Sequence, residues 1–238
     1  MFTHFIALSK LSDREIAYHF SSDTTDEIIS VRDKFMDRSV SISDAAYSIH
    51  ALKTDSPSFE SVKKMDPYFT DVKPFNSVDG FLDQVRELSQ LNSIDVASYL
   101  IRHYEIRPFS LQKTLYYIYA DQLVDGDKRL FISNFVAFDQ GPVDQEVYRY
   151  NKHDHDSLLR QHELEKKLII SGKVDKIEAI IDSGVHKYNQ YFDSLWGDPE
   201  DNPTHRQGSP WSIARDHGGQ NAPILDKYIL KAHHVEQI

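Results

Sequence analysis

The sequence predicts a predominantly helical α+β protein, and three observations support this fold class. Apolar residues recur at helical spacing from residue 77 almost to the end of the sequence. Aromatic and β-branched runs typical of strands occupy only the first twenty residues and a stretch near residue 135. The 238 residues, 40% of them apolar, suffice to bury a sizeable core without disulfides or metals.

The N-terminal part of the sequence predicts a small α+β unit. The runs FTHFIAL (2–8) and EIAYHF (15–20) predict two strands that pair with each other. DEIISVRDKFMDR (26–38) carries apolar residues at helical spacing, and SISDAAYSIHAL (41–52) predicts a second helix with Ser43 as its cap. A helix-turn-helix made of these two helices is an alternative, although the second has few side chains that read bases.

A proline-punctuated region over 54–77 marks the candidate domain boundary. Its three prolines resist helix continuation, whereas its four aromatic residues favour packing against a neighbouring surface. We therefore expect an ordered, irregular connector at this position. It lies within an N-terminal accessory region of residues 1–92, which precedes a second domain over residues 93–238.

Two amphipathic helices precede a third that is predicted to form the centre of the second domain. The first two are SVDGFLDQVRELSQL (77–91) and NSIDVASYLIRHYEI (92–106), the latter with Ser93 as its cap. PFSLQKTLYYIYADQL (108–123) is apolar on most sides from Ser110 onward. A helix of this kind belongs in the middle of a domain, so we predict a helical core around it.

The remainder of the sequence predicts one strand followed by helices. RLFISNFVAFDQ (129–140) is rich in β-branched and aromatic residues and predicts a strand of a small antiparallel sheet. Gly141 and Pro142 end that strand, and Pro142 suits the first turn of the following helix, 144–153. Further helices are expected over 163–170, 174–196 and 223–233.

Composition and charge argue against several classes of protein. The absence of cysteine removes disulfides, thiol catalysis and zinc–thiolate sites. The formal net charge is -10, from 27 basic and 37 acidic residues. Domains that bind the phosphate backbone of nucleic acids are usually positively charged, so nucleic-acid binding is not expected. Neither a signal peptide nor an apolar run long enough for a membrane span is present, which predicts a cytoplasmic protein with no membrane partner.

Histidine-rich and acidic segments raise the alternative of a metal-dependent hydrolase. His153 and His155 would share a face of an extended segment, and GDPEDNPTH is acidic, but neither segment has a recognised ligand spacing. A hydrolase triad of His205, Asp216 and either Ser209 or Ser212 lacks the nucleophile elbow. We therefore expect solvated polar loops in these segments, with no catalytic residue, metal or cofactor.

Four segments, taken in order, resemble the SocA-like, or Panacea, antitoxin domain family. They are DVASYLI, FSLQKTLYYIYADQL, LFISNFVAFDQGPVDQEVY and NPTHRQGSPWSIARDHGGQNAPI. The resemblance covers residues 93–238 and depends on order and spacing, since no single motif is specific. Thr114, Asp139 and Gln140 depart from the family's pattern. We expect these departures to alter local packing or the partner-facing turn. The matching residues are Asp95, Val96, Ala97, Leu111, Gln112, Lys113, Leu115, Tyr116, Gly141, Pro142, Val143, Val147, Tyr148, Thr204, His205, Pro210, Trp211 and Ile224.

The resemblance implies a non-enzymatic antitoxin, from a bacterium or a phage, that neutralises a cognate toxin by binding it. It also implies an alternative role, in which the protein delivers the toxin to a Clp-type protease. Residues 1–92 would be the variable N-terminal region of such proteins. The residues expected to contact the partner are Gln112, Lys113, Tyr116, Tyr117, Gly141, Pro142 and Tyr148. The motif residues expected to have a structural role are Asp95, Leu111, Leu115, Val143, Thr204, His205 and Trp211.

Two interpretations of the start of the central helix remain open at this point. Lys113 beside Tyr116 and Tyr117 combines a charge with rigid aromatic rings, which is the usual composition of a binding hot spot. Alternatively, Lys113 extends to reach solvent and Gln112 bonds a nearby loop. Trp211 is expected to pack into the core.

Overall fold

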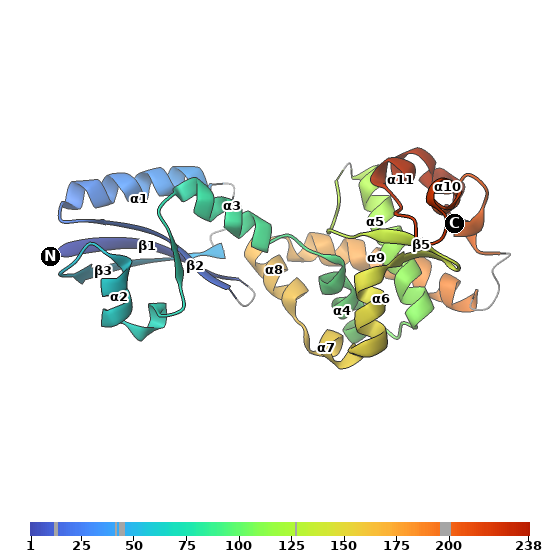
Figure 1. Ribbon diagram of the computed structural model, residues 1–238, viewed down its shortest axis with the longest axis horizontal. Coiled ribbons are helices and arrows are strands. Elements are labelled where there is room, and N and C mark those ends of the chain that lie inside the picture. The colour runs from blue at the N-terminus through green and yellow to red at the C-terminus, as the bar shows by residue number, and fades with distance from the viewer. Residues whose placement is uncertain (12–13, 41, 43–45, 127, 196–200) are drawn as a thin grey trace. The chain divides into compact units, whose positions relative to one another are not determined.

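The computed structural model describes residues 1–11, 14–40, 42, 46–126, 128–195 and 201–238. They form two compact units, an N-terminal unit of residues 1–90 with 165–174 and a C-terminal unit of residues 91–164 with 175–238 (Figure 1). The fold is predominantly helical α+β with two small sheets, as the sequence predicted. The predicted boundary falls after residue 92, whereas the structure divides after residue 90 and returns a later segment to the N-terminal unit.

A four-stranded sheet forms the centre of the N-terminal unit (Figure 1). Its strands are β1 (Phe2–Leu11), β2 (Arg14–Ser22), β3 (Ser48–Thr54) and β4 (Lys73–Phe75). The order across the sheet is β3-β1-β2-β4. β1 and β2 form the predicted antiparallel hairpin, in which Ile6 lies opposite His19, while β3 runs antiparallel to β1 and β4 parallel to β2.

Helices cover both faces of this sheet, because successive strand residues point to opposite sides. One face is covered by α1 (Thr25–Ser39) and α3 (Val78–Leu88), and the other by α2 (Phe59–Met65) and the 3-10 helix η2 (Pro67–Phe69). Phe5 and Ala7 lie in the core on the first side, whereas Ile6 and Leu8 lie in the core on the second. The part of α8 (Glu163–Ser171) that belongs to this unit adds Ile170 to the first core.

The structure corrects two predictions for the N-terminal unit. Residues 48–52, predicted as helix, belong to β3, because pairing with β1 gives their backbone groups partners. A helix-turn-helix is therefore not formed, and Ser43, the predicted cap, lies outside the described residues. The region 54–77 is ordered but contains α2, η2 and β4 instead of irregular chain, and Phe59 and Phe69 are buried.

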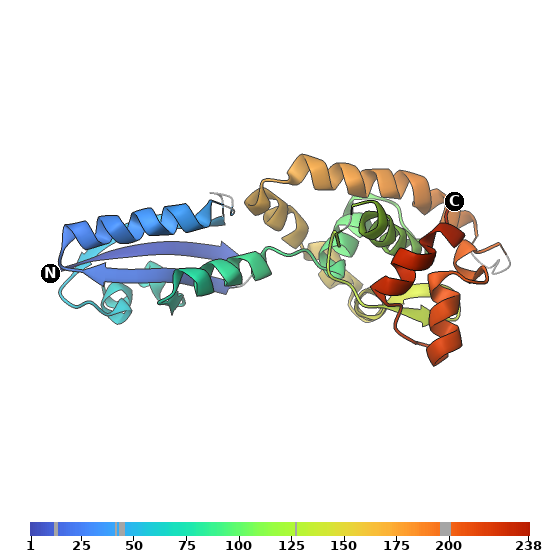
Figure 2. The same ribbon diagram turned by 90° about the horizontal axis from the view of Figure 1, so that it is seen from above.

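α5 (Pro108–Asp125) occupies the middle of the C-terminal unit (Figures 1 and 2). Every residue from Ser110 to Ala120 is buried, which confirms the prediction of a central core helix. Leu111 and Leu115 are completely buried, in accord with a structural role. The other helices of this unit are α4 (Ser93–His103), α6 (Gln145–His153), α7 (His155–Arg160), α9 (Val174–Ser194), α10 (Pro210–Gly218) and α11 (Asp226–Ala232).

A two-stranded antiparallel sheet packs beside α5 and is made of β5 (Phe135–Phe138) and β6 (Gly141–Asp144). β5 is shorter than the strand predicted over 129–140. Pro142 lies in β6 and not in the first turn of a helix, so its predicted position is wrong. The helix begins at Gln145 because the side chain of Asp144 accepts hydrogen bonds from the first free backbone amides of α6.

The cap of α4 also differs from the prediction. Ser93 is the first helical residue, and Asn92 is the cap. Asp95 N donates to Asn92 Oδ1 at 2.9 Å, and Asn92 N donates to Asp95 Oδ2 at 2.8 Å. The two side chains form a capping box, so Asp95 has a structural function at the start of α4.

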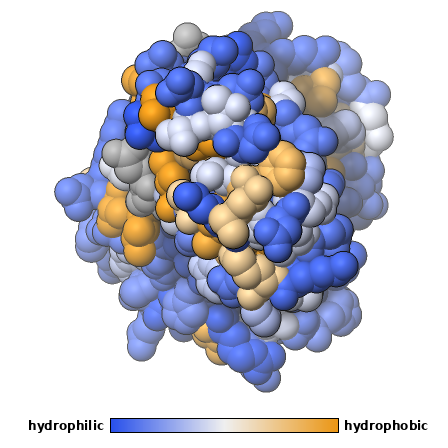
Figure 3. Space-filling model, turned by 90° about the vertical axis from the view of Figure 1, so that its left-hand side faces the viewer, coloured by the Kyte–Doolittle hydropathy of each residue, from blue (hydrophilic) through white to orange (hydrophobic). Residues whose placement is uncertain are grey.

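The surface shown in Figure 3 carries apolar side chains in small groups separated by hydrophilic ones. Single exposed apolar residues, such as Ile29 and Ile49 of the N-terminal unit, are normal on protein surfaces. No helix in the described ranges combines the length and the apolar character that crossing a membrane requires.

Candidate binding pocket

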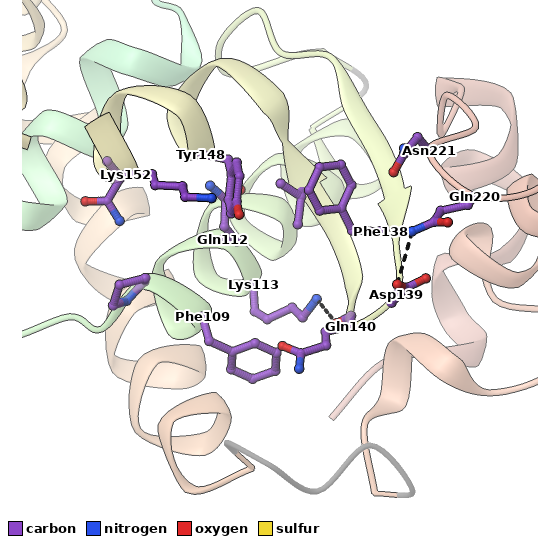
Figure 4. Close-up of a pocket in the computed structure, with 13 residues that line it drawn as sticks. Phe109, Gln112, Lys113, Phe138, Asp139, Gln140, Tyr148, Lys152, Gln220 and Asn221 are labelled. Atoms are coloured by element: carbon purple, nitrogen blue, oxygen red, sulfur yellow. Dashed lines mark hydrogen bonds between the residues drawn. The ribbon is translucent and has the colours of Figure 1, made fainter. Parts of the chain in front are cut away.

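A pocket of about 660 Å³ lies in the C-terminal unit, where the first turns of α5, the β5–β6 hairpin and α6 meet (Figure 4). Its volume is within the range of ligand sites, roughly 300–1,000 Å³. Four residues singled out from the sequence line it, namely Gln112, Lys113, Val143 and Tyr148. The other lining residues are Pro108, Phe109, Phe138, Asp139, Gln140, Asn151, Lys152, Gln220 and Asn221.

Lys113 lines the pocket although it is almost completely buried. Its Nζ donates to the carbonyl oxygen of Gln140 and, at 3.4 Å, to that of Pro142, and it lies 5.1 Å from the centroid of the Phe109 ring. Burial lowers the pKa of Lys113 to about 7, against an opposing effect of Glu236. The alternative in which Lys113 reaches solvent is therefore wrong, because carbonyl groups of the hairpin take the place of water.

Gly141 allows the hairpin to approach Lys113 this closely. It has a φ of 108°, which L side chains rarely adopt. A Cβ atom at this position would collide with Nζ of Lys113 and would lie 2.5 Å from Oγ1 of Thr204. Gly141 is buried, so its contribution is to the geometry of the pocket and not to direct contact with a partner.

Gln112 fixes the start of α6 beside the pocket. Its Oε1 accepts a hydrogen bond from the backbone N of Asp144 at 2.8 Å. The Asp144 carboxylate in turn caps α6 through the amides of Glu146 and Val147 and accepts from the Ser133 hydroxyl at 2.6 Å. The interpretation in which Gln112 bonds a nearby loop agrees with this geometry, and the bond holds α6 in its place at the pocket.

An aromatic wall with a lysine at its edge forms one side of the pocket. The rings of Phe138 and Tyr148 lie edge to face with 5.4 Å between their centroids. Nζ of Lys152 lies 5.6 Å from the centroid of the Tyr148 ring, because the two residues are one helical turn apart on α6. Tyr148 is 41% exposed, so its ring is accessible to a binding partner.

The opposite rim is made of polar side chains from the turn between β5 and β6 and from the loop after α10 (Figure 4). Arg215 Nη1 lies 3.0 Å from Asp139 Oδ1, and Gln220 Nε2 donates to Asp139 Oδ2 at 3.1 Å. Asn221 has a φ of 63°, and its backbone N donates to the carbonyl of Ala137 at 3.0 Å. The loop is thus tied to β5, which holds Gln220 and Asn221 at the rim.

Tyr116 and Tyr117 are completely buried and are not among the residues that line the pocket. The Tyr116 hydroxyl donates to Glu236 Oε1 at 2.6 Å, and the Tyr117 hydroxyl donates to the Glu236 carbonyl at 2.7 Å. Burial raises the pKa of both tyrosines, which keeps their hydroxyls protonated. The prediction that these tyrosines contact a partner is therefore wrong, since their polar groups have partners inside the core.

The same buried network contains a charged histidine in the 3-10 helix η4 (His233–Val235). His233 lies with Nδ1 2.9 Å from the Glu236 carboxyl and Nε2 2.9 Å from that of Asp121. Burial acts to lower the pKa of His233, but these two hydrogen bonds raise it to about 9. The network ties the end of the described chain to α5.

Trp211 and its neighbours lie outside the pocket. The Trp211 ring stacks on His205 with 4.3 Å between centroids, and its Nε1 donates to the carbonyl of Phe138 at 2.7 Å. The ring is partly exposed, so the prediction that it packs into the core is wrong. Thr204 is completely buried and donates its hydroxyl to Oδ1 of Asn202 at 2.8 Å, which is a structural arrangement.

Several of the residues considered for metal or hydrolase chemistry have other roles or lie exposed in the described ranges. No group of three or more histidine, cysteine, aspartate or glutamate residues among them could hold a metal ion. His153 and His155, predicted to lie in a polar loop, instead end α6 and begin α7, where both are exposed. Ser209 caps α10 and donates its hydroxyl to the carbonyl of Thr204 at 2.5 Å. Part of the acidic segment GDPEDNPTH lies outside the described residues.

Comparison with known proteins gives no match to this chain among family models, curated proteins or solved structures.

Several lining residues were missed from the sequence. Lys152 had a usable signal, because it follows Tyr148 by one turn of a predicted helix and so shares its face. Gln220 and Asn221 had none, since nothing in their local sequence shows that they return to the edge of β5, some 80 residues earlier.

Proposed function

We propose that this chain is the antitoxin of a bacterial or phage toxin–antitoxin pair and that it neutralises a cognate toxin by binding it. The observation that carries the proposal is the pocket itself, at which Gln112, Lys113, Val143 and Tyr148 from two separate segments of the resemblance come together. An accessible tyrosine ring in the wall of a pocket is typical of a binding hot spot. Its polar groups serve to hold a partner in place, and no covalent step is required.

Neutralisation by occlusion sets a scale for the interface. An effective antitoxin needs roughly nanomolar affinity, about -12 kcal/mol. Interfaces of this strength commonly bury around 1,600 Å² in total, so the pocket would supply an anchor and the surrounding surface the remaining contact. The net charge of -10 favours rapid encounter with a basic toxin in the cytoplasm, because opposite charges steer association.

The direct test is the toxicity of the product of the adjacent reading frame. We expect bacteria that express it alone to stop growing, and growth to recover when this chain is expressed with it. A neighbour that is harmless alone, or that still stops growth beside this chain, contradicts the proposal. Recovery that requires the host's Clp protease would instead favour the adaptor role.

Recovery should also depend on the pocket. Tyr148→Ala removes an accessible aromatic ring from its wall, so we expect it to weaken the recovery of growth at equal protein level. The control is Tyr228→Ala, which removes a partly exposed tyrosine of α11 that does not line the pocket. Equal recovery with both variants would place the toxin contact elsewhere on the molecule.

A further inference from the structure

We propose that the pocket binds an extended, acidic segment of the partner protein, with one apolar side chain inserted beside Tyr148 and a carboxylate near Lys152. This inference rests on the proposed function and names the chemistry of the partner. Three features of the described residues carry it, namely the local charge, the apolar walls and the amide groups at the rim.

The charge at the pocket is positive although the chain as a whole is acidic. Its ionisable lining residues are Asp139, Lys152 and Lys113, whose pKa of about 7 leaves it only partly charged near neutral pH. Asp139 is compensated by Arg215 and accepts a further hydrogen bond from Gln220. Lys152 is exposed and makes no ion pair with any residue of the described chain. A carboxylate of the partner is therefore the group that complements this rim.

The apolar walls call for a large apolar side chain. Phe109, Phe138 and Tyr148 approach the pocket from three different segments, and the rings of the last two already lie edge to face (Figure 4). A third ring or a branched aliphatic side chain extends this cluster and removes its surface from water. The volume of about 660 Å³ leaves room for the adjoining backbone as well.

The amide groups at the rim match the backbone of an extended peptide. The side-chain amides of Gln140 and Asn221 have no hydrogen-bond partner within the described residues. Each amide both donates and accepts, as every residue of a peptide does. Asn221 holds a left-handed backbone conformation, which asparagine adopts more readily than most residues. A phosphate ligand fits less well, because Lys152 is the one exposed cation among the lining residues.

The test begins with a phage-displayed library of random peptides selected on the full chain. We expect the enriched peptides to share an aromatic or branched aliphatic residue next to aspartate or glutamate. Fluorescence anisotropy with an enriched peptide then measures two variants. Lys152→Glu should weaken binding about tenfold or more, because it replaces attraction with repulsion. Tyr148→Ala should weaken binding by a similar factor, because it removes one wall of the pocket.

Lys227→Glu is the matched control. Like Lys152, Lys227 is an exposed lysine on a helix and lies close to a tyrosine ring. Its Nζ is 5.3 Å from the centroid of the Tyr228 ring, and it does not line the pocket. The substitution Lys227→Glu changes the net charge of the chain by the same amount as Lys152→Glu. Because it does so outside the pocket, where salt screens its charge, it should weaken peptide binding less than about twofold. Equal weakening by the two variants would show a general charge effect and overturn the inference. Thermal unfolding of each variant confirms that it is folded before binding is measured.

Further results of these experiments would contradict the binding of an acidic peptide segment. Enrichment of basic or uncharged peptides, or no enrichment at all, overturns the inference. A small molecule retained in native mass spectra of the purified chain and lost from Tyr148→Ala would likewise overturn it and reassign the pocket. The growth assay is independent of these results: neutralisation without any peptide preference refutes the inference alone, whereas acidic-peptide binding beside a harmless neighbour refutes the proposed function alone.

Discussion

The two units of the molecule hold histidines in opposite protonation states. In the N-terminal unit, His4 and His19 stack with 5.1 Å between ring centroids and share a hydrogen bond of 2.8 Å. His4 also bonds the hydroxyl of Thr54 at 2.8 Å. Burial, with a smaller effect from His4, lowers the pKa of His19 to about 4, so this histidine is neutral near pH 7.

The C-terminal unit instead holds a charged histidine. The pKa of His233 is about 9, because hydrogen bonds to Asp121 and Glu236 outweigh the effect of burial. Burial also acts to raise the pKa of Asp121, yet hydrogen bonds from His233 and Tyr188 lower it. The comparison teaches that one unit depends on a neutral pair and the other on buried ionic hydrogen bonds, so the two should respond to pH in opposite directions.

The largest expected effect comes from breaking the ionic network. Glu236→Ala leaves His233 without one partner and leaves the hydroxyl of Tyr116 without an acceptor, so the free energy of unfolding should fall by about 3–5 kcal/mol. Urea denaturation followed by tryptophan fluorescence measures this loss. Glu146→Ala, in the exposed first turn of α6, is the control and should cost less than about 1 kcal/mol. Similar losses in both variants would refute an energetic role for the network.

Alkaline pH should destabilise the C-terminal unit. The pKa of His233 in the folded state, about 9, lies above its ordinary value of 6.5, so the stabilisation is fully present below pH 6.5 and is lost as the pH rises through 9. The full loss is on the order of 3 kcal/mol. Trp211 lies in this unit, so a change of its fluorescence during urea denaturation reports on the unit. If the free energy of unfolding of His233→Gln still falls between pH 6.5 and 9, the effect belongs to another titrating group.

Acid should destabilise the N-terminal unit by a smaller amount. The pKa of His19 in the folded state, about 4, lies below 6.5, so stability should be lost as the pH falls from 6.5 towards 4. The loss should stay below about 3 kcal/mol, because His19 is partly exposed and solvent screens its charge. Hydrogen exchange of β1 and β2 peptides, corrected for intrinsic rates, follows this unit alone. His19→Gln should make the protection of these amides less dependent on pH. An unchanged pH dependence would exclude the histidine pair as its source.

A pair of glycine substitutions tests how closely the hairpin packs on Lys113. Gly141→Ala should lower the free energy of unfolding by about 2 kcal/mol, because it combines an unfavourable φ with a collision against Lys113 and Thr204. Gly208→Ala is matched in its positive φ of 85° but has open space around the added atom, so about 1 kcal/mol is expected. Thermal unfolding ranks the two. Equal losses would mean that the approach to Lys113 adds nothing.

The smallest effect on stability is expected at the pocket itself. Tyr148→Ala should change the free energy of unfolding by less than about 1 kcal/mol, because the ring is 41% exposed. Urea denaturation of the variant measures this value. A loss of several kcal/mol would show that the ring is part of the core, and a defect in partner binding could then no longer be attributed to the pocket.

Local patterns predicted the elements whose side chains repeat regularly along the chain. The hairpin of β1 and β2 and the burial of α5 followed from the spacing of apolar residues. The same reasoning failed for residues 48–54, because a short apolar run is compatible with helix or strand and pairing with β1 decides between them. It also placed Pro142 in a helix, since only the pairing of β6 with β5, in which Pro142 lies opposite Ala137, shows that the chain is still extended there.

Only some residues of the candidate pocket could be identified from the sequence. Gln112 and Lys113 stood out as polar residues in an apolar helix, but the sequence could not show that Lys113 is enclosed by the hairpin or that Tyr117 faces inward. A helix that is apolar on nearly every side has no preferred face, so its orientation is set by its neighbours.

The sequence by itself determined the fold class and the central position of α5, because those depend on how apolar residues recur along one segment. Only the tertiary structure decided which polar groups are buried and which line the pocket. Tyr148, Gln220 and Lys113 come from three segments that meet through long-range packing. Contacts of that kind depend on the free energy of the whole core and leave no periodic trace in the local sequence.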